Sequence, residues 1–127
     1  MTRLSIEIEG FRHKNPVPNA CRIGDLLISG PIAGTEPDGS LPASLEAQCT
    51  NIFAHVRSIM AKAGGSTDDV IKMTVWLMDP TDREALNREW RSMFPDPSSR
   101  PARHVLPIIG ENPTLIHCDI MAVFHGG

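Results

Sequence analysis

The chain has 127 residues, of which 41% are apolar and 21% are charged, and its formal net charge is −3. A chain of this length typically forms one domain around a single core, and its apolar content excludes intrinsic disorder. No apolar run approaches the roughly 20 residues that cross a bilayer, and residues 1–10 lack the apolar segment of a secretory signal. We therefore expect one domain over residues 1–127, and neither a membrane protein nor a secreted one.

Charge and cysteine content narrow the classes of partner. The chain has 12 Lys and Arg against 15 Asp and Glu, and it has no tyrosine. A nucleic-acid surface is unexpected, because phosphate binding needs clustered positive charge. Cys21, Cys49 and Cys118 are widely spaced and form no C-x-x-C pair. This pattern argues against a disulfide framework or a structural zinc site and favours a reducing cytoplasm.

Short apolar runs and turn residues alternate in the first third of the chain. Apolar and polar residues alternate over residues 4–9, which predicts a half-exposed strand. A rigid connector with two prolines follows at 15–19. Residues 21–23 and 26–29 predict a hairpin whose second arm ends at a Gly-Pro pair. Residues 34–42 are rich in Gly, Pro, Asp and Ser and are expected to form a loop.

Two helices follow from the spacing of apolar residues. From residue 44 to 63 the apolar side chains form one stripe at helical spacing, and Gly64-Gly65 supplies the stop. The capping box Thr81-x-x-Glu84 predicts the start of a second helix, and three prolines between 95 and 101 forbid its continuation. The apolar face of this second helix would carry Leu86, Trp90, Met93 and Phe94.

The remaining segments, 70–78, 104–108 and 115–124, predict strands. One face of the last strand is wholly apolar and suited to lie under the helices, with Ile116, Cys118, Ile120, Ala122 and Phe124. The matching face of strand 70–78 carries Ile71, Met73, Val75 and Leu77. The opposite face of the sheet is too apolar to stand in water, with Trp76, Leu115, Met121 and Val123, and predicts contact with another copy of the chain. The element order predicts an α/β sandwich, a mixed sheet with two helices packed on one face.

Two charged residues carry the strongest signals of chemistry. Arg103 follows a proline-rich loop and stands at the mouth of strand 104–108, where a rigid backbone can aim its guanidinium at a small carboxylate. The alternative is an ordinary surface ion pair. Asp119 lies mid-strand among apolar neighbours, where an unpaired carboxylate is costly. It could hold a water as a general base, or accept hydrogen bonds from Arg103 or from backbone amides.

Weaker signals come from Ser29-Gly30, Asn87 and His117. A glycine that ends a buried strand allows close approach of a ligand but equally marks a plain turn. Asn87, on the second helix, is either a cleft residue or a solvated one. His117 and Asp119 have a spacing that could ligate a metal, but no second His or Cys stands nearby, so we expect no metal site. Because phosphate-binding and dinucleotide motifs are also absent from the sequence, we expect no metal, nucleotide or pyridoxal cofactor.

Several segments, taken in order, resemble the RidA family, also called YjgF or L-PSP proteins. They are Gly24–Gly30, Glu46–Gly64, Val70–Leu77, Leu86-Asn87, Pro101-Ala102-Arg103 and the last strand around Asp119. The resemblance covers about Asn15 to Phe124. It implies a chorismate-mutase-like fold and a homotrimer packed through its sheets, with three clefts between subunits.

The resemblance also implies an activity. RidA-type proteins hydrolyse reactive enamines and imines, such as 2-aminoacrylate, to 2-oxo acids and ammonia. By their places in the motifs, Arg103 would hold the substrate carboxylate and Asp119 would help to place the attacking water, while Ser29, Gly30 and Asn87 would line the cleft. An imine carbon is already electrophilic, so positioning supplies most of the catalysis. We expect a deaminase acting on 2-imino acids or aminomuconate-like acids.

Two positions depart from the RidA pattern. Val17 stands where RidA-type members carry the tyrosine of a Gly-Pro-Tyr-Ser motif, and Asp119 replaces a longer glutamate. These departures keep other functions open. One is a non-enzymatic trimer that binds small carboxylates or acts as a chaperone. Another is an endoribonuclease, which the low positive charge disfavours.

Overall fold

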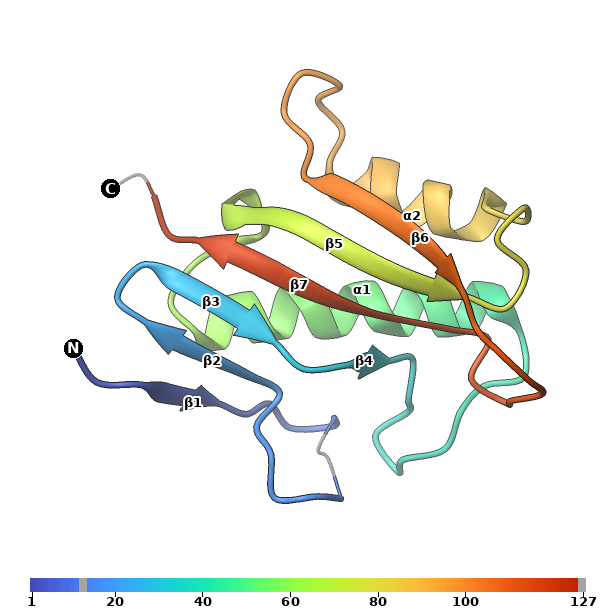
Figure 1. Cartoon of the computed structure of the whole chain (residues 1–127), viewed down its shortest axis with the longest axis horizontal. Helices are drawn as coiled ribbons and strands as arrows, with labels where there is room; N and C mark the ends of the chain where they lie inside the picture. The colour runs from blue at the N-terminus through green and yellow to red at the C-terminus, as the bar shows by residue number, and fades with distance from the viewer. Residues whose placement is uncertain (12–13, 126–127) are drawn as a thin grey trace.

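Both helices lie on one face of a mixed sheet, as predicted. The computed structural model describes residues 1–11 and 14–125 (Figure 1). Within them the strands are β1 (Leu4–Ile6), β2 (Ala20–Ile23), β3 (Leu26–Ser29), β4 (Ile32–Ala33), β5 (Val70–Leu77), β6 (Ala102–Pro107) and β7 (Ile116–Val123). The helices are α1 (Leu45–Lys62) and α2 (Glu84–Met93), and a 3₁₀ turn, η1 (Thr67–Asp69), precedes β5. Neither helix in this part of the chain has the length and apolarity needed to cross a membrane.

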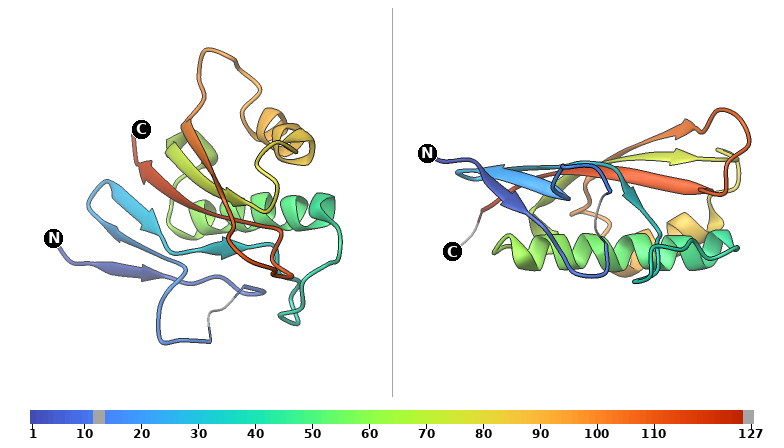
Figure 2. Two further views of the ribbon diagram at one scale, coloured as in Figure 1. Left: turned by 45° about the vertical axis from the view of Figure 1, so that its right-hand side comes forward. Right: turned by 90° about the horizontal axis from the view of Figure 1, so that it is seen from below.

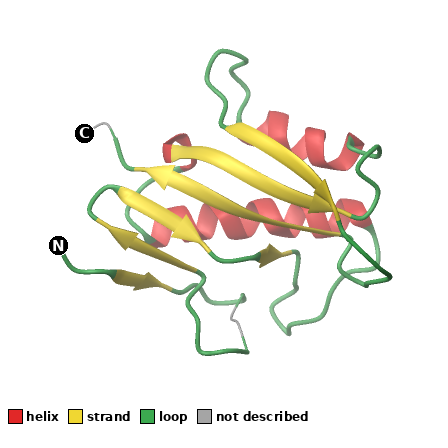
Figure 3. Ribbon diagram, in the orientation of Figure 1, coloured by secondary structure: helices red, strands yellow, loops and turns green. Residues whose placement is uncertain are grey.

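β7 is the strand around which the sheet is organised. The strand order is β1-β2-β3-β7-β5-β6, and β4 pairs with β7 beyond the end of β3 (Figure 3). β5 and β6 run parallel, while the other pairs run antiparallel. At the break between β3 and β4, the Ser29 hydroxyl accepts a hydrogen bond of 2.8 Å from the Ile120 amide. This bond satisfies a buried backbone donor of β7 that would otherwise lack a partner.

The core forms between the helices and the inner face of the sheet. The right-hand view of Figure 2 shows these two layers from below. The predicted stripe of α1 is buried, with Cys49, Ile52, Phe53, Val56, Ile59 and Met60. The predicted inner face of β7 is confirmed by the burial of Ile116, Cys118, Ile120 and Ala122. Each large side chain of this set contributes about 1.5–3 kcal/mol by leaving water. The burial of both surfaces explains why α1 spans the sheet along its length.

The predicted inner face of β5 is wrong at one residue. Met73, Val75 and Leu77 are buried as expected, but Ile71 is 46% exposed and Val70 is buried in its place. The pairing with β7 passes from Val70 directly to Lys72, so a β-bulge adds one residue here. A bulge reverses the alternation of side chains on its far side, and alternation alone does not reveal it.

Helix α2 begins at Glu84, so the predicted capping box at Thr81 is wrong. The Thr81 hydroxyl and amide bind the Asp79 carboxylate at 2.7 and 3.0 Å. Thr81 therefore closes a turn before the helix, and Arg83 occupies the N-cap position without a side-chain capping bond. Local side-chain bonds of this kind compete with helix capping.

The edges of the sheet also differ from the prediction. β6 begins at Ala102, two residues before the predicted strand, so Arg103 lies within the strand and not at its mouth. The first strand ends at Ile6, and only an isolated bridge between Ile8 and Phe11 extends it. The short β4 and η1 have no periodicity to predict them, because neither is longer than one repeat of its pattern.

Gln48 is a buried polar residue of α1 that ties two loops to the helix. Its Nε2 donates to the carbonyls of Pro42 and Pro113 at 2.8 and 3.0 Å, and its Oε1 accepts from the Leu115 amide at 2.9 Å. Gly34 packs on the backbone of Gln48 so closely that a Cβ there would clash with the Gln48 carbonyl oxygen. These contacts fix the entry of β7 against the start of α1.

We expect Gln48→Ala to lower the free energy of unfolding by about 2–4 kcal/mol, because it leaves buried backbone groups without hydrogen-bond partners. Thr50→Ala, an exposed change two residues away, is the matched control and should cost no more than about 0.5 kcal/mol. Urea unfolding followed by circular dichroism measures both. Equal losses in the two variants would contradict the role given to Gln48.

Candidate functional site

Arg103 lies on the helix-facing side of β6. It pairs with the buried Met73 of β5, so its side chain reaches toward α2. Its guanidinium carbon lies 4.9 Å from the centre of the Trp90 ring, a cation–π contact. Burial lowers the pKa of Arg103, and the nearby charge of Arg83 lowers it further. The guanidinium still carries its charge at neutral pH, since its ordinary pKa is so high.

The guanidinium of Arg103 has no acidic partner in the described part of the chain. Across residues 1–11 and 14–125, no carboxylate lies within 4.0 Å of its nitrogens. The aromatic ring of Trp90 supports one side of the group without neutralising it. A half-buried guanidinium in this condition can pair with the carboxylate of a ligand through two parallel hydrogen bonds.

Asn87 lies on the face of α2 that also carries Trp90. The two residues are three positions apart, and Arg83 is four positions before Asn87, so the three side chains form one row on the helix. Asn87 is half-buried. The structure therefore brings Arg103 and Asn87, two of the predicted site residues, to the same region beside α2.

Asp119 lies on the opposite, open face of the sheet. It pairs with Thr74, whose side chain alternates with the buried residues of β5. Partial burial raises the pKa of the Asp119 carboxyl. The charges of His117 and Lys72 and a hydrogen bond from Thr74 act in the other direction but do not cancel this shift. A carboxylate with a raised pKa is a stronger base than an ordinary surface aspartate, which suits proton transfer from water.

His117 shares the open face with Asp119, as their spacing predicts. Its ring stacks on Trp76, with centroids 5.0 Å and planes 13° apart. Its buried Nδ1 has no hydrogen-bond partner among the described residues. Burial lowers the pKa of His117 against the opposing charge of Asp119, so the ring is mainly neutral at pH 7. Over the same residues, no three His, Cys, Asp or Glu side chains are arranged to hold a metal.

Ser29 and Gly30 lie where β3 ends and β4 begins. The buried Ser29 hydroxyl, which accepts from Ile120, also donates to the Gly30 carbonyl at 2.8 Å. The Gly30 amide donates to the Asn19 carbonyl at 2.9 Å. The Ser29 side chain thus fixes the backbone conformation where β3 ends. Gly30, which precedes Pro31, is partly exposed.

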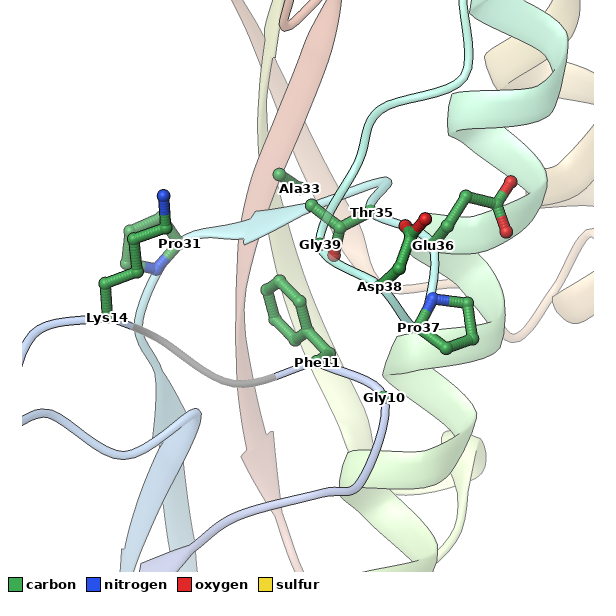
Figure 4. Close-up of a pocket in the computed structure, with 10 residues that line it drawn as sticks. All are labelled: Gly10, Phe11, Lys14, Pro31, Ala33, Thr35, Glu36, Pro37, Asp38 and Gly39. Carbon is green, nitrogen blue, oxygen red and sulfur yellow. The ribbon is translucent and has the colours of Figure 1, made fainter.

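A cavity of about 500 Å³ opens at the edge of β4 (Figure 4). Its lining includes Phe11, Lys14, Pro31 and Ala33, together with loop residues 35–39. Ala33 pairs with His117, which places the cavity beside the histidine of the open face. The predicted site residues are not part of this lining, and neither is Val17, which is 50% exposed.

Three of the predicted site residues thus lie on opposite faces of the sheet. Arg103 and Asn87 lie on the helix side, whereas Asp119 lies on the open side, and β5 runs between β6 and β7. Neighbouring strands are about 4.8 Å apart, so two strand spacings as well as the sheet itself separate Arg103 from Asp119. A small ligand on either face of one chain does not reach both.

Sequence reasoning missed Trp90 and Arg83 as site residues. The apolar spacing of α2 assigns Trp90 to the core, and its contact with Arg103 depends on the packing of α2 against β6. For Arg83 a signal was present, because its four-residue spacing from Asn87 places both on one helix face.

Comparisons with known proteins agree with this fold. The family described as Endoribonuclease L-PSP matches residues 14–113. A RutC family protein of Haemophilus influenzae is 34% identical over 80 residues, which is 62% of this chain and 62% of that protein. A protein of Escherichia coli with the provisional name reactive intermediate deaminase TdcF is 32% identical over 80 residues, again 62% of each chain. Both alignments thus span less than two thirds of the relative's length.

A solved structure of RidA from the Antarctic bacterium Psychrobacter sp. PAMC 21119 has the same fold. Its TM-score is 0.85, with 22% identity over 95% of this chain and 99% of that chain. At this identity the likeness concerns the fold alone. The family match, which covers most of the sequence, goes further: the chain belongs to the Endoribonuclease L-PSP family, also called RidA or YjgF.

Proposed function

We propose that the chain hydrolyses reactive 2-imino and enamine acids to 2-oxo acids and ammonia. The observation that carries this proposal is the half-buried, unpaired guanidinium of Arg103 on the ring of Trp90. It supplies a fixed positive site of the size of one carboxylate. The relative named reactive intermediate deaminase supports the same class of reaction. The free cysteines of the described chain suit a reducing cytoplasm as the compartment.

The proposed mechanism needs one bound carboxylate and one oriented water. Arg103 pairs with the substrate carboxylate, which fixes the adjacent C=N carbon in space. Asp119 takes a proton from the water as its oxygen bonds to that carbon. That proton then passes to the nitrogen and gives a carbinolamine. Asp119 next carries the proton of the new hydroxyl to the nitrogen, so that the C–N bond breaks, the carbonyl forms and ammonia leaves. An enamine enters the same route after protonation at carbon gives the imine.

A cleft between two copies of the chain brings the two groups together in this proposal. The open face carries a continuous apolar patch, 36–47% exposed, made of Ile23, Leu26, Ile28, Met121 and Val123. Exposure of such an apolar face to water is unfavourable, and a cyclic homotrimer would cover it in every copy. Because Arg103 and Asp119 lie on opposite faces of one chain, each cleft would take Arg103 from one copy and Asp119 from its neighbour.

The deciding assay generates 2-imino acids in place with an amino-acid oxidase and compares ammonia release with and without the protein. Acceleration across short and branched imines is the expected result. No acceleration, combined with tight binding of 2-oxo acids, would favour the non-enzymatic carboxylate binder. Cleavage of RNA would favour the endoribonuclease, which the net charge of −3 disfavours.

Arg103→Ala should lower kcat/KM for imine hydrolysis about ten- to a hundredfold, since a charged hydrogen bond contributes about 1.5–3 kcal/mol. Arg103→Lys should recover only part of this loss, because an ammonium does not form the two-pronged pair. Arg88→Ala, an exposed change on another face of α2, is the control and should retain activity. A folded Arg103→Ala protein with unaltered kinetics would refute the assignment.

Asp119→Asn should lower kcat more than it raises KM, because the change removes the base but keeps the shape. The unprotonated carboxylate is the active form, so activity should fall as pH drops through a pKa raised above the ordinary aspartate value of about 3.9. Asp119→Asn should lose this acid limb, and His117→Gln should keep it. Stopped-flow rates between pH 4 and 8 test this prediction. An acid limb that is lost in His117→Gln and kept in Asp119→Asn would contradict it.

Light scattering should give a mass near three times the 13.9 kDa of the chain. Ile28→Glu, which places a charge in the apolar patch, should shift the mass toward the monomer. Ile109→Glu is the matched control, because Ile109 is 94% exposed outside the patch. A monomeric native protein at micromolar concentration would contradict the trimer.

A further inference from the structure

Arg83 is a second arginine beside the Arg103 region that the proposed mechanism leaves unused. It precedes the first turn of α2, and its Nε donates to the Pro80 carbonyl at 2.7 Å. This bond holds the guanidinium of Arg83 at its Nε atom. Within the described residues, its terminal nitrogens make no ion pair.

The two guanidiniums lie near each other, and neither has an ion-pair partner in the described part of the chain. Arg83, Asn87 and Trp90 lie in one row on α2, and Arg103 rests on the Trp90 end of that row. Arg83 is close enough to lower the pKa of Arg103. No carboxylate of the described chain pairs with either arginine. Like charges held on one surface repel each other unless a ligand supplies negative charge.

From this row the geometry points to Arg83 as a specificity-determining residue that binds a second, distal carboxylate, so that the site favours dicarboxylic 2-imino acids. This inference rests on the proposed function of Arg103. A dianion matches two guanidiniums in charge, whereas a monocarboxylate leaves one of them unpaired. Asn87, between the two, can donate its side-chain amide to the linking chain of the ligand.

The spacing along the helix limits the length of such a ligand. Arg83 and Trp90 are seven positions apart, which is about 10 Å along a helix axis. Both guanidiniums stand at the ends of long side chains, and that of Arg83 is close enough to act on the pKa of Arg103. The second carboxylate therefore belongs to a short acid, of about the length of glutarate, and not to a long-chain one.

The test compares two imines of equal chain length that differ in the distal carboxylate. Oxidases generate 2-iminoglutarate from glutamate and 2-iminopentanoate from norvaline, and ammonia release is followed for each. The native protein should prefer 2-iminoglutarate. Arg83→Gln should lower kcat/KM for 2-iminoglutarate about ten- to a hundredfold, mainly through KM, and change that for 2-iminopentanoate less than twofold. Arg88→Gln, on the other face of α2, should change neither.

Two results would overturn the inference: a native preference for 2-iminopentanoate, or an Arg83→Gln variant that loses activity equally on both imines. If the native protein hydrolyses neither imine, the proposed function fails, and calorimetry with 2-oxoglutarate and 2-oxopentanoate decides the role of Arg83 separately. Tighter binding of 2-oxoglutarate, lost in Arg83→Gln, supports the inference. Equal binding of both acids overturns it.

Discussion

The apolar face that the sheet leaves uncovered is the constraint on which the rest of the protein depends. α1 and α2 bury the inner face, whereas the outer face presents aliphatic side chains of β2, β3 and β7. Among them stand the partly buried Asp119 and the unpartnered Nδ1 of His117. An exposed apolar face of this kind is typical of a surface that another protein covers. We propose that a second copy of the chain covers this face, which would remove Asp119 further from water.

The same constraint divides the proposed active site. Strand β5 separates the half that would bind the carboxylate, on the side of α2, from the half that would activate water, on the open face. Neither half is complete alone, so chemistry would begin only after assembly. In such a cleft the ligand would lie between the α2 side of β6 in one copy and the open sheet face of the next, so both halves would position it from regular secondary structure.

The sequence predicts the elements whose signals are periodic and local. The stripe of α1 and the alternation of β7 are repeated often enough to be read without the structure. The bulge that exposes Ile71 and the turn that removes Thr81 from α2 depend on single pairings that periodicity does not encode. The sequence identifies Arg103 as a candidate site residue, but it does not predict the face of the sheet on which Arg103 lies. That face is set by the register between β5 and β6, a contact between distant parts of the chain.

Subunit complementation tests most directly whether the site is shared between copies. Arg103→Ala and Asp119→Asn proteins, each folded and weakly active alone, are dissociated, mixed in equal amounts and reassembled. In a cyclic trimer whose clefts take one residue from each neighbour, about a quarter of the clefts then regain both native residues. We expect imine hydrolysis to rise to about that fraction of the native rate. A mixture that is no more active than the two variants separately would contradict a site built from Arg103 of one copy and Asp119 of the next.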